Sequence, residues 1–173
     1  MARVVYRLKQ AWHHLFIAPR AIDLQMVAEV LPEAAVTLFC RMTRGDQAHA
    51  CCVLAKLRRS GPISADLAQA ALLHDVGKAG ARLSLLYRTM IVILRGLAPG
   101  ALRKLGQVGN PAWRKPFYIQ RQHAAIGAYL CESAGCSPWV VQLVMNHDLS
   151  TSEGAAMMRD VELAALCAAD NTC

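Results

Sequence analysis

The chain has 173 residues, of which 55% are hydrophobic and 18% charged, and its formal net charge is +7. A chain of this length can bury one substantial core but is too short for two full-sized domains, so a single domain is expected. No apolar stretch of about 18 residues is free of charge, and the N-terminus lacks the apolar core of a signal peptide, so we expect no membrane span and a cytoplasmic location.

The composition favours helices over strands. Aromatic residues make up only 6% of the chain, and the apolar residues are mainly Ala, Leu, Val and Met. Few stretches alternate apolar with polar residues, as a half-buried strand would. We therefore expect an all-α fold, a compact helical bundle of about six to eight helices.

The positions of proline, glycine and capping residues divide the chain into helix-sized pieces. In chain order the expected helices span 21–45 with a break at Leu31-Pro32, then 46–59, 66–77, 82–95, 101–106, 120–134, 138–147 and 160–173. Ser137-Pro138 supplies an N-cap and a first-turn proline for one of them. The stretch 106–117, which contains Pro111 and Pro116, is expected to be a loop.

These pieces predict the following organisation. Residues 1–45 form an N-terminal helical extension that packs on the same domain, and residues 46–173 form the main domain with a basic, apolar insert at 82–118. In the helix expected over 82–95 the apolar positions nearly encircle the axis, while Arg88 and Arg95 share one face. The favoured interpretation is a core helix with two arginines that reach for water, and the alternative is a helix on an anionic membrane or at a dimer interface.

The seven cysteines are an odd number and have no C-x-x-C spacing. This pattern argues against a disulfide framework and for a reducing compartment. We expect the cysteines to be small buried apolar residues, at Cys40, Cys51, Cys52, Cys131, Cys136 and Cys167.

Four of the six histidines fall one on each of four predicted helices, at His49, His74, His123 and His147. His74 is followed by Asp75, and the last predicted helix contains Asp170. A bundle brings inward-facing side chains from several helices together, and imidazoles with carboxylates bind zinc, iron or manganese. A lone histidine is more often a core residue, but four in this arrangement favour a metal site. His13 and His14 are expected to be a solvated N-terminal pair.

Adjacent residues on a regular helix point about 100° apart. His74 and Asp75 can therefore aim at one centre only if the helix loosens there, which Gly77 permits.

Five segments carry a family resemblance, in the order DQAHACCVLAKL, ALLHDVGK, HAAIGAYL, VMNHD and AADN. Over roughly residues 46–171 the sequence resembles the HD-domain superfamily of metal-dependent phosphohydrolases. ALLHDVGK is the most specific segment, because it matches in the apolar lead-in, the His-Asp pair and the following Gly-Lys. The resemblance implies a helical bundle of the HD type.

The resemblance also implies a ligand set. One metal would be held by the residues that match the shared H…HD…D pattern, His49, His74, Asp75 and Asp170. His123 and His147 match the additional histidines of the binuclear branches, in which Asp75 would bridge the two ions. The implied cofactor is a divalent metal, as two ions, with iron or manganese favoured over magnesium or zinc.

The implied chemistry needs no protein nucleophile, because two ions about 3.5–4 Å apart bind a phosphate and activate a water for in-line attack. The residues expected to take part in catalysis are Asp75 and Lys78, the lysine neutralising phosphate charge. The alternative for Lys78 is a plain lysine at a helix C-terminus, an end that favours cations.

The expected substrate class depends on where the sequence differs from known branches of the HD superfamily, as well as on where it matches them. The chain reads NHDLSTSEG where cyclic-di-GMP phosphodiesterases carry a GYP signature, so that activity is not expected. Hydrolases of diadenosine tetraphosphate share the ligand order, but the insert at 82–118 sets this chain apart, and it looks more like stand-alone bacterial HD-domain proteins. The predicted function is hydrolysis of a phosphate ester or anhydride in a nucleotide-like substrate. The alternative is a catalytically silent module that senses a nucleotide or contacts a membrane surface.

The expected partner is a phosphorylated small molecule. Nucleic acid is not expected, because the chain has no recognisable reading motif, no aromatic platform and no dense basic run. Peripheral membrane contact through 82–95 belongs to the alternative, and no oligomeric state is predicted.

Overall fold

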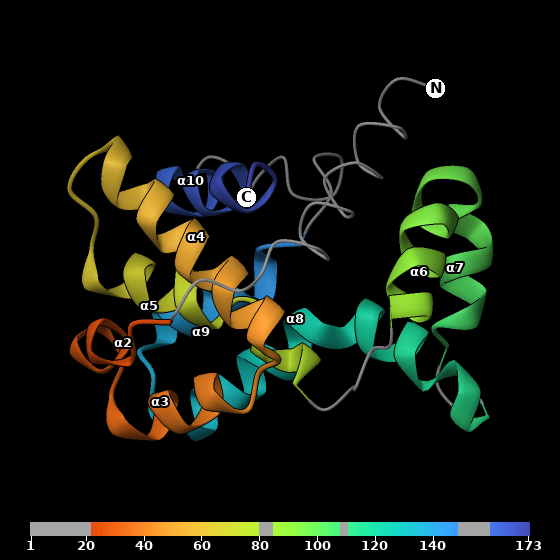
Figure 1. Cartoon of the computed structure of the whole chain (residues 1–173), viewed down its shortest axis with the longest axis horizontal. Helices are drawn as coiled ribbons and strands as arrows, with labels where there is room; N and C mark the ends of the chain where they lie inside the picture. The colour runs from red at the N-terminus through yellow and green to blue at the C-terminus, as the bar shows by residue number, and fades with distance from the viewer. Residues whose placement is uncertain (1–21, 80–84, 108–110, 149–159) are drawn as a thin grey trace. The chain divides into compact units, whose positions relative to one another are not determined.

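A computed structural model describes residues 22–79, 85–107, 111–148 and 160–173. These ranges contain nine α-helices, two short 3₁₀ helices and no strand (Figure 1). The all-α prediction is confirmed, with more helices than expected. The prediction for His13 and His14 lies outside the described residues.

The α-helices are α2 (Leu24–Val30), α3 (Glu33–Cys40), α4 (Arg44–Ser60), α5 (Ala65–Leu73), α6 (Leu85–Leu97), α7 (Pro99–Leu105), α8 (Lys115–Ser133), α9 (Pro138–Asn146) and α10 (Val161–Asp170). The 3₁₀ helices are η1 (Val76–Lys78) and η2 (Ala112–Arg114). None of the described helices combines the length and the apolarity needed to cross a membrane.

The described chain forms two compact units. The larger unit comprises the described residues of 20–79 and 123–173, and the smaller unit those of 80–122. All the predicted site residues belong to the larger unit. The first part of α8 belongs to the smaller unit and the remainder to the larger one.

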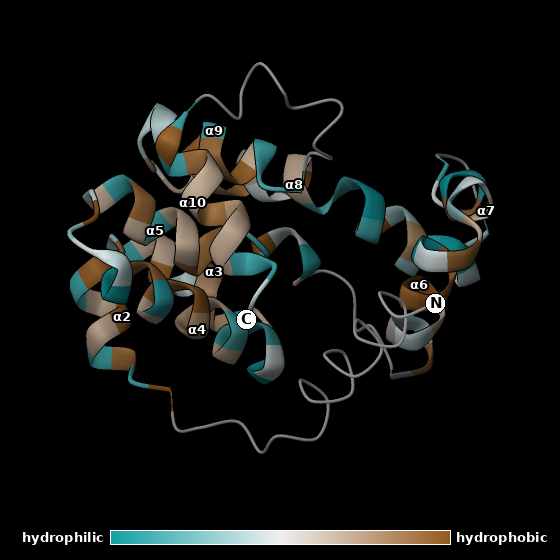
Figure 2. Ribbon diagram, turned by 90° about the horizontal axis from the view of Figure 1, so that it is seen from above, coloured by the Kyte–Doolittle hydropathy of each residue, from teal (hydrophilic) through white to brown (hydrophobic). Residues whose placement is uncertain are grey.

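Helix α5 is the centre of the larger unit. It packs against α4 and α9, and two thirds of its residues are buried. The short side chains of its alanines let the neighbouring helices approach closely, while its leucines fill the space between them. Apolar residues accordingly dominate α5 and α10 in Figure 2. The C-terminal end of α5, where the His-Asp pair follows, therefore lies in the interior.

The starts of α4 and α8 lie earlier than predicted. Helix α4 begins at Arg44, since the Thr43 hydroxyl accepts a hydrogen bond from the Asp46 amide at 3.2 Å and donates one to the Asp46 carboxylate at 2.6 Å. Helix α8 begins at Lys115, so the loop predicted for 106–117 is wrong in its last part. Pro116 fits the first helical turn, where no backbone N–H is needed.

The smaller unit has its own apolar centre. Ile91 of α6 is buried, as are Phe117 and Ile119 of α8. The ring centroids of Tyr87 and Phe117 are 5.6 Å apart. The core-helix interpretation thus holds for one face of α6, while other apolar residues of this helix are exposed.

Candidate metal centre

The structure brings all six predicted ligands together in the larger unit, in two groups of three. The open group is His49, His74 and Asp170, and the buried group is Asp75, His123 and His147. Within each group the ligand atoms lie within 4.8 Å of one another. Each group offers two imidazoles and one carboxylate, a donor set that suits a divalent transition metal.

The ends of three helices meet at this cluster. His74 is the C-cap of α5, His147 is the C-cap of α9, and Asp170 is the last residue of α10. The unpaired carbonyls at a helix C-terminus carry partial negative charge, so this position favours a cation. The backbone and the side chains therefore act in the same direction.

The two capping histidines are fixed in the same tautomer. Nδ1 of His74 is 3.0 Å from the Ala71 carbonyl oxygen, and Nδ1 of His147 is 2.7 Å from that of Val144. A carbonyl only accepts hydrogen bonds, so each Nδ1 donates and Nε2 is the nitrogen left to bind a metal. A metal-ligating histidine is commonly oriented in this way by a backbone carbonyl.

The Nε2 atom of His74 shows why the cluster fits a metal ion. It is buried and, among the described residues, makes no hydrogen bond. A buried polar atom without a partner is costly, and a bound cation would supply the missing partner.

The open group is held by a direct contact between its outer members. His49 Nε2 donates a hydrogen bond to Asp170 Oδ1 at 2.7 Å, and His74 Nε2 lies 3.5 Å from the same oxygen. Burial acts to raise the pKa of Asp170, but the hydrogen bond from His49 and the nearby His74 hold this pKa well below its usual range. Asp170 is therefore ionised near pH 7, as a carboxylate that binds a metal must be.

The buried group is tighter. The Nε2 atoms of His123 and His147 are 3.2 Å apart, and Asp75 Oδ1 lies 3.5 Å from the first and 3.7 Å from the second. Burial and the nearby Lys78 ammonium lower the pKa of His123 from 6.5 to about 4. His123 is therefore neutral near pH 7, as a metal ligand must be.

Asp75 lies between the two groups. Its Oδ2 is 3.8 Å from His74 Nε2 of the open group, while its Oδ1 faces the histidines of the buried group. Burial acts to raise its pKa, but Lys78 and the neighbouring histidines together outweigh this and hold the pKa well below its usual range. Lys78 Nζ contacts both carboxylate oxygens, at 2.6 and 2.7 Å.

The helix loosens at the His-Asp pair, as the two side chains require. Helix α5 ends at Leu73, and Asp75 adopts φ −98° and ψ 5° before η1 begins. Gly77 has a different role from the one expected, since a Cβ on it would overlap the His123 carbonyl oxygen and lie 2.8 Å from the Gly127 amide nitrogen. Gly77 allows η1 to approach α8, which brings Asp75 to His123.

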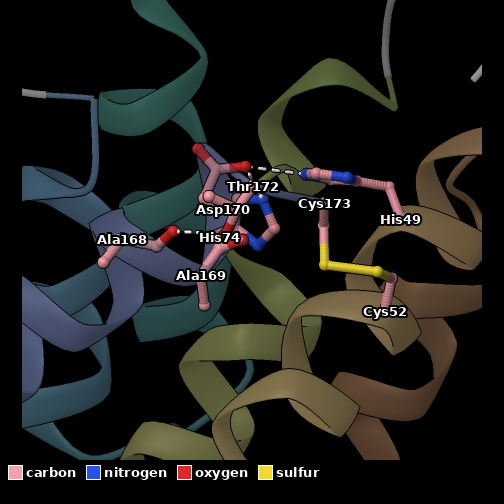
Figure 3. The surroundings of a disulfide bond; sticks show 8 residues. All are labelled: His49, Cys52, His74, Ala168, Ala169, Asp170, Thr172 and Cys173. Atoms are coloured by element: carbon pink, nitrogen blue, oxygen red, sulfur yellow. Dashed lines mark hydrogen bonds and ion pairs between the residues drawn. A yellow bond between two sulfur atoms is a disulfide. The ribbon is translucent and has the colours of Figure 1, made fainter. Parts of the chain in front are cut away.

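The cysteine pattern argued against disulfides, but one links α4 to the residues just after α10. Cys52 follows His49 by three residues on α4, and Cys173 follows Asp170 by three residues (Figure 3). The Cα atoms of the two cysteines are 6.0 Å apart. This equal spacing of each cysteine from a residue of the open group was a usable signal in the sequence.

The expectation of buried cysteines is wrong for Cys40 and for the disulfide-bonded Cys52, which are both exposed. It is right for Cys131 and Cys167.

Asp148 repeats the His-Asp pair at the end of α9 but has a different position. It is exposed, and its Oδ2 lies 4.0 Å from His123 Nε2. It belongs to neither ligand group.

Comparison with known protein families, with curated proteins and with solved structures finds no match. The cluster itself is therefore the basis for a function.

Proposed function

We propose that this chain is a metal-dependent phosphohydrolase of the HD type that acts on a nucleotide-like phosphate ester or anhydride. The observation that carries the proposal is the pair of groups with two imidazoles and one carboxylate each, with Asp75 between them. Mixed imidazole and carboxylate donors favour iron or manganese over magnesium, which prefers oxygen ligands. The resemblance around ALLHDVGK supports the same conclusion.

The roles of the residues follow from their positions. His49, His74 and Asp170 would hold one ion, His123 and His147 the second, and Asp75 both. Two bound divalent ions would lower the pKa of a water and stabilise the charge that develops on a phosphoryl group.

Lys78 would bind the substrate. Its ammonium lies at the edge of the cluster and its side chain is 19% exposed. It would neutralise a phosphate oxygen that arrives from solvent, as a point charge does.

The first experiment measures metal and activity on the same protein. The purified chain would be analysed by inductively coupled plasma mass spectrometry, stripped with a chelator, and reloaded with Mn²⁺, Fe²⁺, Mg²⁺ or Zn²⁺. Each form would be tested for phosphate release from nucleoside mono-, di- and triphosphates and from dinucleoside polyphosphates. We expect bound transition metal and turnover that depends on Mn²⁺ or Fe²⁺.

Two variants keep this experiment decisive. His123→Ala should lose metal and turnover, while Glu132→Gln removes an exposed carboxylate on α8 and should change neither. Circular dichroism would establish that both variants fold. A folded wild-type protein that binds no metal, or turnover that survives His123→Ala, would overturn the proposal.

The alternative function is a silent nucleotide-binding module, and one observation favours it. The Lys78 ammonium contacts both oxygens of Asp75 and so already supplies a cation to the proposed bridging ligand. In that case nucleotides would raise the melting temperature of the metal-loaded protein without being hydrolysed. Turnover of any compound in the panel would exclude this alternative.

A further inference from the structure

Charge is divided unequally between the two units. Residues 80–122 contain eight lysines and arginines and no aspartate or glutamate. All twelve acidic residues lie in the sequence ranges of the larger unit. The positive net charge of the chain therefore does not come from the unit that carries the candidate metal centre. The smaller unit is basic by itself.

Helix α6 adds an exposed apolar face to this basic unit. Its exposed apolar residues are Leu86, Met90, Ile93 and Leu97. They follow the spacing of one helix face, within an arc of roughly 60° at about 100° per residue. The most exposed of them are Leu86 at 68% and Leu97 at 71%. Ile91 on another side of α6 is buried, so the exposed face is separate from the core of this unit.

The surroundings of this face are aromatic and cationic. Trp113 is 52% exposed, and its carbonyl accepts a hydrogen bond from the Tyr87 hydroxyl of α6 at 3.0 Å. The Arg114 guanidinium lies 4.7 Å from the Trp113 ring centroid. Arg103 and Lys104 on the adjoining α7 are exposed. Trp and Arg are favoured where a protein surface meets lipid headgroups.

We propose that the exposed face of α6 docks on an anionic lipid surface. Its leucines, methionine and isoleucine would enter the boundary between headgroups and acyl chains, while Arg103 and Lys104 attract anionic headgroups. Charge complementarity selects this occupant over a second copy of the chain, because two copies meeting through α6 would bring two basic units together. It also selects lipid over nucleic acid, since aliphatic side chains neither stack on bases nor hydrogen-bond to them. The proposal does not depend on the proposed enzymatic function.

The test is sedimentation of the full-length protein with vesicles. One set contains only phosphatidylcholine and the other includes about 30% phosphatidylserine. We expect the protein to pellet with the anionic vesicles, and the bound fraction to fall as salt rises. The double variant Leu86→Gln/Leu97→Gln should weaken binding by at least about tenfold, and Arg103→Gln/Lys104→Gln by a similar factor.

A matched control separates docking from general apolarity. Val161→Gln replaces an aliphatic residue of the larger unit that is 81% exposed, and it should bind vesicles as the wild type does. Four results would overturn the proposal: no binding to anionic vesicles, equal binding to both vesicle types, wild-type binding by both double variants, or tighter binding to single-stranded RNA than to vesicles. A dimer in light scattering that Leu86→Gln/Leu97→Gln dissociates would assign the face to self-association instead.

Discussion

The two ligand groups have the same donors but are held in different ways. In the buried group the side chains of His123, on α8, and His147, at the end of α9, are 2% exposed. In the open group His49 is 18% and Asp170 30% exposed, and Asp170 is in the last helix of the chain. The buried ligands are positioned by the core itself, whereas the carboxylate of the open group depends on the docking of α10. We therefore expect an ion in the buried group to exchange more slowly than one in the open group.

The largest expected effect comes from the carboxylate that both groups share. Asp75→Asn should lower turnover by at least about 100-fold, beyond the 10–100-fold typical of residues that only orient a ligand. It should also release both ions, whereas Asp170→Asn should release only the ion of the open group. Metal content per chain and kcat of the two variants would be measured together. Equal losses in both variants would mean that the two groups are not distinct.

The second prediction tests the close approach of η1 to α8, which brings Asp75 to His123. Gly77→Ala places a Cβ against the His123 backbone, so it should cost more than the roughly 1–3 kcal/mol of ordinary overpacking. Gly127→Ala is the matched control, because its Cβ would lie 3.1 Å from the Val144 side chain and 3.3 Å from the Gly77 backbone nitrogen, where neighbours need to shift by only a few tenths of an ångström. Helix propensity offsets part of that cost. Urea unfolding of the two metal-free variants would check the difference, and similar midpoints would contradict it.

The third prediction concerns pH and the metal-free protein. The pKa of His123 is lowered to about 4 from 6.5, so between these values the unfolded chain binds more protons than the folded one. The free energy of unfolding should therefore fall as pH drops through this window, by up to about 1.4 kcal/mol per pH unit. His123→Gln should flatten this slope in urea titrations at several pH values. An unchanged slope would show that His123 is not the group responsible.

The smallest expected effect is a loss of metal affinity in the open group. Cys173→Ser removes the disulfide that holds α10 near His49, so it should lower the affinity for the more exchangeable ion severalfold and leave the other unchanged. Competition with a fluorescent chelator would resolve the two affinities. Cys136→Ser, which changes a cysteine outside the disulfide, is the control. A loss of both ions from Cys173→Ser would contradict the division into two groups.

The helical architecture and the six clustered residues could be predicted because both follow from local sequence. Apolar periodicity, prolines and N-caps such as Ser137 act over a few residues, and the histidines gain meaning from their order around ALLHDVGK. Some local features were not predicted: the two 3₁₀ helices, the early start of α8 and the capping of α4 by Thr43. Each depends on which of several neighbouring residues begins a helix.

Long-range features could not be read in the same way. The contact between Gly77 and the backbone of α8 joins segments 46 residues apart, and no local pattern reports it. The contact of Lys78 with Asp75 is local, but it depends on the 3₁₀ turn of η1 between them, which was not predicted. The Cys52–Cys173 bond was missed because the count of cysteines was used and their spacing from the ligands was not.

That bond makes a covalent ring of the chain from Cys52 to Cys173, with a sequence separation of 121. Five of the six clustered residues lie inside the ring, and His49 lies just outside it. A single backbone cut anywhere in the ring opens it without releasing a fragment. A protein nicked between the two units would therefore keep both ligand groups on one covalent molecule, and would separate into two pieces only after reduction.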